Sequence, residues 1–181
     1  MANTNLAEKF PAKTKLYRKK MEELLDDIDI KILRQLQTNA SLTTKELADL
    51  VHLSTSPVYE RQKRLEREGY IEKYIAVVNP KKTKNNMIVF CNICLKQHGK
   101  AISEDFMNSI ANLDEVTECY NTSGDYDFMM KVFVRDMEHY QDFVLNTLGV
   151  IESIGSLHSI FVIGEVKNTH SLPIHDVLRK K

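Results

Sequence analysis

The chain has 181 residues, 43% of them apolar, enough for a packed core in one mid-sized domain or two small ones. No run approaches the roughly 20 apolar residues of a membrane span, and the basic N-terminus has no apolar signal core, so we expect a cytoplasmic protein without membrane contact. The net charge is zero, but the charges are unevenly distributed. Residues 1–85 contain 17 Lys and Arg and 12 Asp and Glu, whereas residues 86–181 contain 8 Lys and Arg and 13 Asp and Glu. Only the positive first half suits a polyanionic partner.

Metal, disulfide and cofactor chemistry are not expected. Three cysteines are too few for a disulfide scaffold and agree with a reducing compartment. Cys91 and Cys94 lie in the apolar run 87–95, which is typical of a strand, and an offset of three places their thiols on opposite faces. The histidines show no metal-ligand spacing, and no Gly-rich phosphate motif occurs. We therefore predict no metal, no cofactor and no enzyme.

The N-terminal part predicts a tail followed by a helix. Residues 1–23 are polar and basic with little periodicity, which favours a flexible tail over the alternative of an additional phosphate-binding arm. Apolar residues then recur at steps of three and four that form one face of a helix: Leu25, Ile28, Ile32 and Leu36.

Two more helices follow, separated by a short turn. Thr43 and Glu46 form the two ends of a capping box that starts the second helix, which is interrupted after Val51. Ser54 is a good N-cap for the third helix, and Gly69 is a suitable C-cap. Three short helices with a tight turn between the second and third are the helix-turn-helix pattern, here within the basic half of the chain.

The third helix presents a polar face that is suited to duplex DNA. With Val58 at the centre of the buried face, Leu65 lies about 20° away, and the polar residues point outward. Such side chains contact base edges and phosphates, and the N-terminus of the helix offers free N–H groups to a phosphate. The candidate DNA-binding residues are Ser54, Thr55, Ser56, Tyr59, Glu60, Lys63, Arg64 and Arg67. Arg61 flanks the buried face, so we expect it to form a structural ion pair with Asp29.

The second half predicts an alternation of strands and helices. Residues 70–78 favour extended structure, and a polar segment over 81–86 marks a linker. The following pattern gives strands at 87–95, 116–122, 128–134 and about 156–166, with helices after the first and the third strand. This βαββαβ order predicts an α+β, ferredoxin-like domain with both helices on one face of an antiparallel sheet. Apolar residues such as Phe133, Phe161 and Ile163 suggest that a second subunit covers the other face.

These motifs resemble the Lrp/AsnC family of transcriptional regulators. The resemblance rests on the opening segment 25–33, on the helix-turn-helix residues 46–71, and on Gly124-Asp125-Tyr126-Asp127. It implies a winged helix-turn-helix domain at 24–80 and an AsnC-type effector and oligomerisation domain at 87–181. It also implies binding of double-stranded DNA by a homodimer that assembles into tetramers or octamers, and modulation by an amino acid.

The resemblance also suggests where a small molecule binds. The Gly-Asp-x-Asp turn of this family helps to form a site between dimers, where carboxylates can hold an α-ammonium group. The candidate effector residues are Thr122, Ser123, Gly124, Asp125, Tyr126, Asp127, Ser153 and Ser156. Two alternatives stay open. One is a siroheme decarboxylase, which needs histidine and arginine side chains at a tetrapyrrole pocket, whereas Arg135 is the only arginine between residues 86 and 178. The other is an architectural protein that coats DNA without a ligand.

Overall fold

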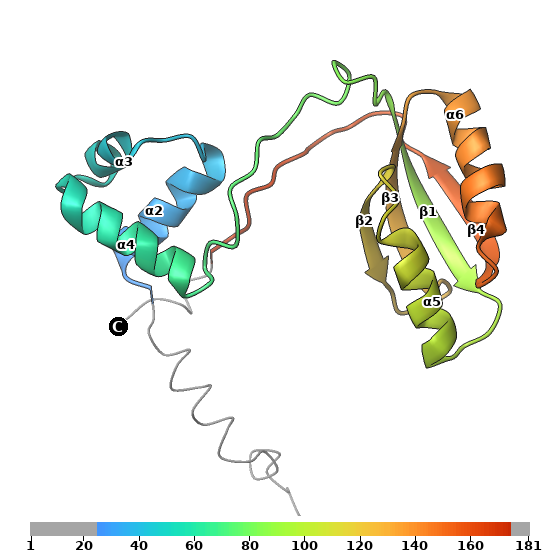
Figure 1. Cartoon of the computed structure of the whole chain (residues 1–181). Coiled ribbons are helices and arrows are strands. Elements are labelled where there is room, and N and C mark those ends of the chain that lie inside the picture. Colours follow the sequence, from blue (N-terminus) through green and yellow to red (C-terminus); the bar gives the residue numbers. More distant parts are fainter. Residues whose placement is uncertain (1–24, 175–181) are drawn as a thin grey trace, which may run out of the picture. The chain divides into compact units, whose positions relative to one another are not determined.

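The computed structural model describes residues 25–174 and divides them into two compact units (Figure 1). The first unit contains residues 25–76 together with 169–174, and the second contains residues 77–168. The predicted tail over 1–23 lies outside the described residues. The family resemblance implies a second domain over 87–181, whereas in the structure residues 169–174 group with the first unit.

Three helices build the first unit around one core. They are α2 (Asp27–Thr38), α3 (Thr44–Val51) and α4 (Thr55–Arg67). Thr43 and Glu46 form the predicted capping box of α3, and Asp26 and Asp29 form a second one at the start of α2. Apolar side chains from all three helices then pack together, which confirms the helical periodicity of this half.

The turn between α3 and α4 uses a left-handed residue. His52 ends α3 with φ 58° and ψ 46°, and its N–H bonds back to Ala48 and Asp49. Histidine is among the non-glycine residues that adopt this conformation more readily than most. The prediction of a tight helix-turn-helix connection is therefore confirmed without a glycine at the turn.

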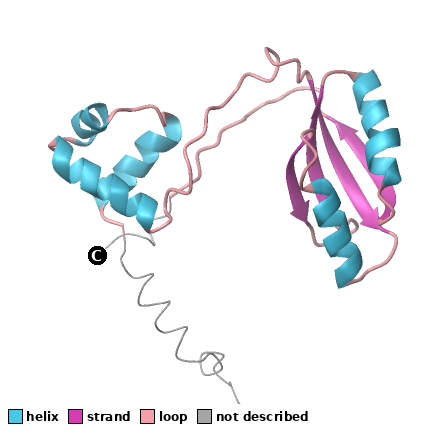
Figure 2. Ribbon diagram, viewed as in Figure 1, coloured by secondary structure: helices cyan, strands magenta, loops and turns pink. Residues whose placement is uncertain are grey.

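Residues 70–78 are a loop, although their alternating pattern favours a strand (Figure 2). The side chains of Ile75, Val77 and Val78 are 55%, 68% and 62% exposed. An extended segment becomes a strand only when another strand supplies hydrogen-bond partners. The described part of the first unit contains none, so the alternation does not produce a ladder here.

The second unit is a four-stranded antiparallel sheet with helices on one face (Figure 2). Its elements are β1 (Met87–Leu95), α5 (Lys100–Ile110), β2 (Val116–Asn121), β3 (Phe128–Val134), α6 (Met137–Asp142) and β4 (Ile154–Phe161). A π-helical turn over Phe143–Thr147 and a 3-10 turn over Leu148–Val150 continue α6. The strand order β2-β3-β1-β4 confirms the predicted ferredoxin-like βαββαβ arrangement.

The last strand begins and ends earlier than the apolar pattern predicts. β4 starts at Ile154, beside an irregularity in its pairing with Leu95 of β1. At the other end the N–H of Val162 donates to the carbonyl of Ile88, next to the first residue of β1. Because β1 begins there, residues beyond Val162 have no partner strand in this unit, and their apolar side chains stay outside the ladder.

The helices cover one face of the sheet and leave the other face without a covering element among the described residues. Val89 and Cys91 of β1 point into the core beneath the helices, where the Cys91 thiol lies 3.3 Å from the Tyr140 hydroxyl. Cys94 donates instead to the carbonyl of Asp125, which confirms that the two thiols face opposite sides. Phe161 was predicted on the uncovered face, but it pairs with Val89 and packs edge-on against Tyr140 on the helix side.

Candidate nucleic-acid interface and small-molecule site

Helix α4 has one buried side and one exposed polar side. Val58 and Leu65 are fully buried, as the helical geometry predicts. Exposed residues cover the first turn and the outer face: Ser54, Thr55, Ser56, Tyr59, Glu60, Lys63 and Arg67. These are seven of the eight candidate DNA-binding residues.

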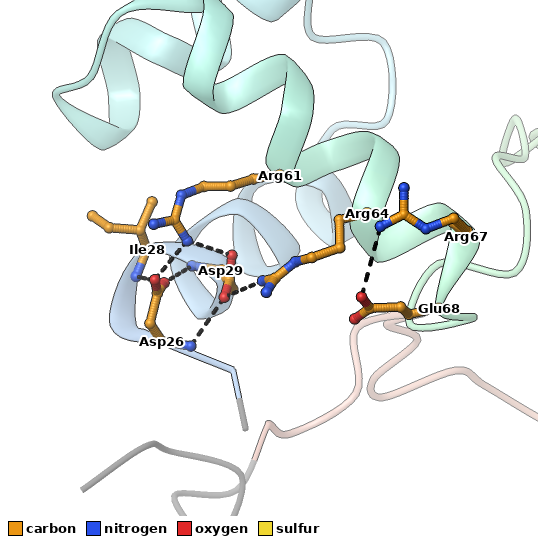
Figure 3. Close-up of polar contacts among 7 residues, drawn as sticks. All are labelled: Asp26, Ile28, Asp29, Arg61, Arg64, Arg67 and Glu68. Carbon is orange, nitrogen blue, oxygen red and sulfur yellow. Dashed lines mark hydrogen bonds and ion pairs between the residues drawn. The ribbon is translucent and has the colours of Figure 1, made fainter. Parts of the chain in front are cut away.

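Two arginines of α4 converge on one buried carboxylate of α2 (Figure 3). The Asp29 side chain is only 1% exposed and accepts from Arg61 Nη1 at 2.7 Å and from Arg64 Nη2 at 2.5 Å. Arg61 Nη1 also donates to Asp26 at 2.6 Å. The predicted Arg61–Asp29 pair is therefore present, and it belongs to a larger cluster that joins α2 to α4.

Arg64 has a structural partner that the sequence pattern did not indicate. Its side chain is 26% exposed, and its guanidinium is held by Asp29. Arg64 is the one candidate residue that is half-buried and not exposed, so a DNA contact by Arg64 stays a prediction, and the proposed DNA surface consists of the seven exposed residues. The spacing along the helix could have indicated this contact with Asp29, because Arg64 lies one turn after Arg61 and reaches the same carboxylate.

The cluster also influences the ionisation of Asp26. Burial opposes the charged form of this carboxylate, but the N–H of Asp29 and the guanidinium of Arg61 outweigh it and lower the pKa of Asp26. Asp26 at the same time caps α2 by accepting from the N–H groups of Ile28 and Asp29. One residue therefore connects helix capping to the contact between α2 and α4, and sequence reasoning missed it as a partner of Arg61.

A second polar network ties the segment after α4 to this helix. The Tyr74 hydroxyl donates to Glu66 Oε1 and accepts from Gln62 Nε2, both at 2.9 Å. Lys63 donates to Glu66 Oε2 at 2.6 Å, and its ammonium lies 5.8 Å from the centre of the Tyr59 ring. The hydrogen bond to Glu66 raises the pKa of Lys63. Lys63 is thus a fixed positive charge on the outer face of α4.

A shallow hollow marks the start of the exposed face. Thr44 of α3 and Thr55, Ser56, Tyr59 and Glu60 of α4 line this hollow of about 330 Å³. Ser54 is the N-cap residue of α4, but its side chain makes no capping hydrogen bond. The hydroxyl of Ser54 and the first N–H groups of α4 can therefore interact with a bound group. Thr44 is the one lining residue that the sequence pattern did not indicate.

The predicted small-molecule turn connects β2 and β3. Gly124 has φ 128°, a conformation that suits glycine, and Thr122 closes the turn through bonds to the carbonyls of Asp127 and Tyr126 at 2.9 and 2.7 Å. The Asp127 carboxylate is already engaged: it accepts from the N–H of Leu95 at 2.8 Å, and its other oxygen lies 3.3 Å from His98 Nδ1. The carboxylate of Asp125, in contrast, is exposed.

Ser153 and Ser156 lie near the start of β4. Ser153 is 4% exposed, and its carbonyl accepts from the N–H of Lys96, while its hydroxyl has no hydrogen-bond partner among residues 25–174. Ser156 is exposed and pairs with Cys94, whose thiol donates to the carbonyl of Asp125. These contacts place Ser156 of β4 beside Cys94 of β1, which itself contacts the turn.

Comparison with known proteins accounts for both halves of the chain. Residues 25–72 match a winged helix-turn-helix DNA-binding domain, and residues 88–172 match the Lrp/AsnC ligand-binding domain. The chain belongs to the Lrp/AsnC family. It is a DNA-binding regulator with a ligand-binding domain, so we call residues 25–76 with 169–174 the DNA-binding unit and residues 77–168 the ligand-binding unit.

Several relatives of this Lrp/AsnC-family protein are similar over most of their length. The leucine-responsive regulatory protein of Haemophilus influenzae is 37% identical over 158 residues, which cover 87% of this chain and 95% of that protein. The Escherichia coli protein of the same name is 35% identical, with 83% and 92% covered. A transcriptional regulator from Neisseria meningitidis, solved in complex with L-methionine, is 36% identical with a TM-score of 0.82, covering 85% and 99%.

Two classes of feature are not found in the described part of this family member. Among residues 25–174, no group of histidine, cysteine and acidic side chains has an arrangement that could hold a metal ion. Within the same range, no helix combines the length and the apolar character that crossing a bilayer requires.

Proposed function

We propose that the chain regulates transcription by placing the exposed face of α4 in the major groove of duplex DNA. The observation that carries this proposal is the exposure of Ser54, Thr55, Ser56, Tyr59, Glu60, Lys63 and Arg67 opposite the buried Val58 and Leu65. In helix-turn-helix proteins the second helix of the motif reads base edges while the first crosses the backbone. In this chain α4 is that second helix and α3 is the first.

The exposed residues suit two kinds of DNA contact: hydrogen bonds from the start of α4, and ionic contacts from the cations farther along the helix. The hydroxyls and N–H groups at the start of α4 suit phosphate oxygens, and the hollow beside Tyr59 and Glu60 offers a hydroxyl and a carboxylate to base edges. Lys63 and Arg67 lie farther along the helix and suit the phosphate backbone. Ionic contacts between these cations and phosphates supply affinity that falls as the salt concentration rises.

Changing Lys63 to alanine is expected to weaken DNA binding about fivefold and to reduce the slope of log affinity against log salt by about one unit, because one phosphate contact is lost. The measurement uses a duplex selected from a random library by the full-length protein, titrated at several salt concentrations. Lys100→Ala is the matched control, because Lys100 is 88% exposed in the ligand-binding unit and pairs only with Glu104 among the described residues.

An unchanged affinity and slope for Lys63→Ala would contradict the proposed surface. Equal binding to the selected duplex and to a shuffled sequence of the same composition would favour the alternative of a sequence-independent architectural protein.

We also infer that the chain responds to an amino acid at the turn between β2 and β3. The Neisseria relative was solved with L-methionine, and the family model for residues 88–172 describes a ligand-binding domain. The exposed Asp125 carboxylate suits an α-ammonium group, while backbone N–H groups at Ser123 and Gly124 suit a carboxylate. Asp127 shapes the site, because its oxygens hold Leu95 and His98.

Replacing Asp125 by asparagine is expected to weaken binding of L-methionine at least about tenfold, because one charge-assisted hydrogen bond to the ammonium is lost. Calorimetric titration of the full-length protein measures this, with Asp105→Asn on the outside of α5 as the control. No binding of any of the common amino acids to the unaltered protein would contradict the amino-acid response, and DNA binding would still be judged by the Lys63 variant.

A second copy of the chain is the proposed cover of the free sheet face. This face carries Ile88, Phe90, Met129, Phe133 and Ile160, and Ile160 is 45% exposed. In the middle of it, the buried Asn92 has a side-chain oxygen with no hydrogen-bond partner among residues 25–174. Burial of an apolar sheet face against its own copy is a common route to a dimer, and further assembly to tetramers or octamers is part of the same proposal.

We propose that this regulator acts by binding and not by catalysis. One relative is named a leucine-responsive regulatory protein, and another is named a transcriptional regulator. The decarboxylase alternative requires arginine at a tetrapyrrole pocket, whereas Arg135 is 55% exposed and paired with Asp136 at 2.7 Å.

A further inference from the structure

The last described residues of the chain are fastened to the end of helix α2. The N–H of Leu172 donates to Gln37 Oε1 at 2.6 Å, and Gln37 Nε2 donates back to the Leu172 carbonyl at 3.3 Å. A side-chain amide in this arrangement bonds both polar groups of one residue's backbone. The side chain of Leu172 is 76% exposed, so the contact depends on the main chain of the segment and hardly on its side chain.

Two more contacts strengthen the attachment. Ser171 Oγ donates to the Gln37 carbonyl at 3.4 Å. This carbonyl is one of the last four in α2, which have no partner within the helix. Ile174 packs against the apolar core of the DNA-binding unit. The segment from Thr169 to Ile174 therefore helps to cap α2 and to cover the core beneath it.

The chain path gives this attachment a consequence for DNA binding. Residues 162–168 connect the attached segment directly to β4 of the ligand-binding unit, so the two units are joined by two stretches of chain. Helix α2 carries Gln37 near its C-terminal end and Asp29 near its N-terminal end. Asp29 in turn holds Arg61 and Arg64 of α4. Helix α2 thus lies between the segment 169–174 and helix α4.

We propose that Gln37 is a positioning residue that latches the C-terminal segment 169–174 onto the DNA-binding unit, and that DNA affinity depends on this latch. It connects the end of β4, through α2 and Asp29, to the orientation of α4. The proposal deepens the proposed function, because it rests on α4 being the DNA-contacting helix.

The test compares the full-length protein with Gln37→Met, which keeps the length of the side chain and its suitability for a helix but removes both hydrogen bonds. Leu172→Pro removes the donor N–H of the segment and restricts the backbone of residues 171 and 172, while every residue of α2 is unchanged. Lys167→Ala, an exposed change in the same connection but outside the contact, is the control. Measurements are the exchange rate of the Leu172 amide, the unfolding temperature, and the dissociation constant for a selected duplex well below that temperature.

The expected result has two parts. Gln37→Met accelerates exchange of the Leu172 amide about tenfold, as the loss of two modest hydrogen bonds implies. Both Gln37→Met and Leu172→Pro weaken DNA binding about three- to tenfold with no change in the salt slope, since no phosphate contact is removed. The control matches the unaltered protein in each measurement.

Two outcomes would overturn the latch. Exchange at the unaltered rate in Gln37→Met shows that the contact does not protect the segment in solution. Faster exchange with a lower unfolding temperature but an unchanged dissociation constant shows that the contact only stabilises the unit. Failure of the proposed function is visible separately. In that case Lys63→Ala, in a protein whose segment 169–174 is unaltered, leaves the DNA affinity and its salt slope unchanged.

Discussion

Replacing Asp29 by alanine is expected to lower the free energy of unfolding of the DNA-binding unit by about 3–5 kcal/mol. The carboxylate is 1% exposed and holds two guanidinium groups together with the N–H of Asp26. Removing it leaves Arg61 and Arg64 close together, partly buried and without their shared counter-charge. A loss of this size is a large fraction of the stability of a typical small domain. Hydrogen exchange of peptides from each unit, followed in increasing urea, measures the effect separately for the two units.

Two comparisons make this prediction specific. Asp49→Ala removes an exposed carboxylate from α3 of the same unit and is expected to change little. Replacing Asp29 by alanine together with Arg61 and Arg64 by methionine is expected to recover a large part of the loss, because no buried charge then lacks a partner. A single Asp29→Ala variant that is as stable as Asp49→Ala would show that the cluster in Figure 3 contributes little.

Placing a charge on the free sheet face is expected to separate the proposed dimer. Ile160 pairs with Phe90 on this face and is 45% exposed in one chain. In Ile160→Asp, a second copy could cover the face only by burying an unpaired carboxylate, which costs several kcal/mol. We therefore expect the dissociation constant of the dimer to rise about 100-fold or more, as measured by sedimentation equilibrium.

The control is Val150→Asp, which introduces the same charge at a side chain that is 69% exposed in the 3-10 turn after α6. This variant is expected to remain dimeric. If Ile160→Asp associates as strongly as Val150→Asp, a surface other than the open sheet face makes the dimer.

Much of the fold was predictable because local chemistry determines it. Helix starts depend on side chains that bond nearby N–H groups, so Thr43 and Glu46 specify the start of α3 whatever surrounds them. The apolar repeat places Val58 and Leu65 on the inner side of α4 for the same reason. The family resemblance then predicted the type of domain that these elements form in each half of the chain.

Three features depended on residues that are distant in sequence, so the pattern along the chain did not determine them. Arg64 is held on the inner side because Asp29, 35 residues earlier, is buried where both arginines reach it. The end of β4 depends on where β1 begins, since a strand continues only beside a partner. The attachment of Leu172 to Gln37, 135 residues apart, follows from the chain's return to α2. Hydrogen bonds and burial between remote segments exist only after folding. For this reason the sequence alone determined the helices and the order of the strands, whereas the tertiary structure decided these contacts, the end of β4 and the loop over 70–78.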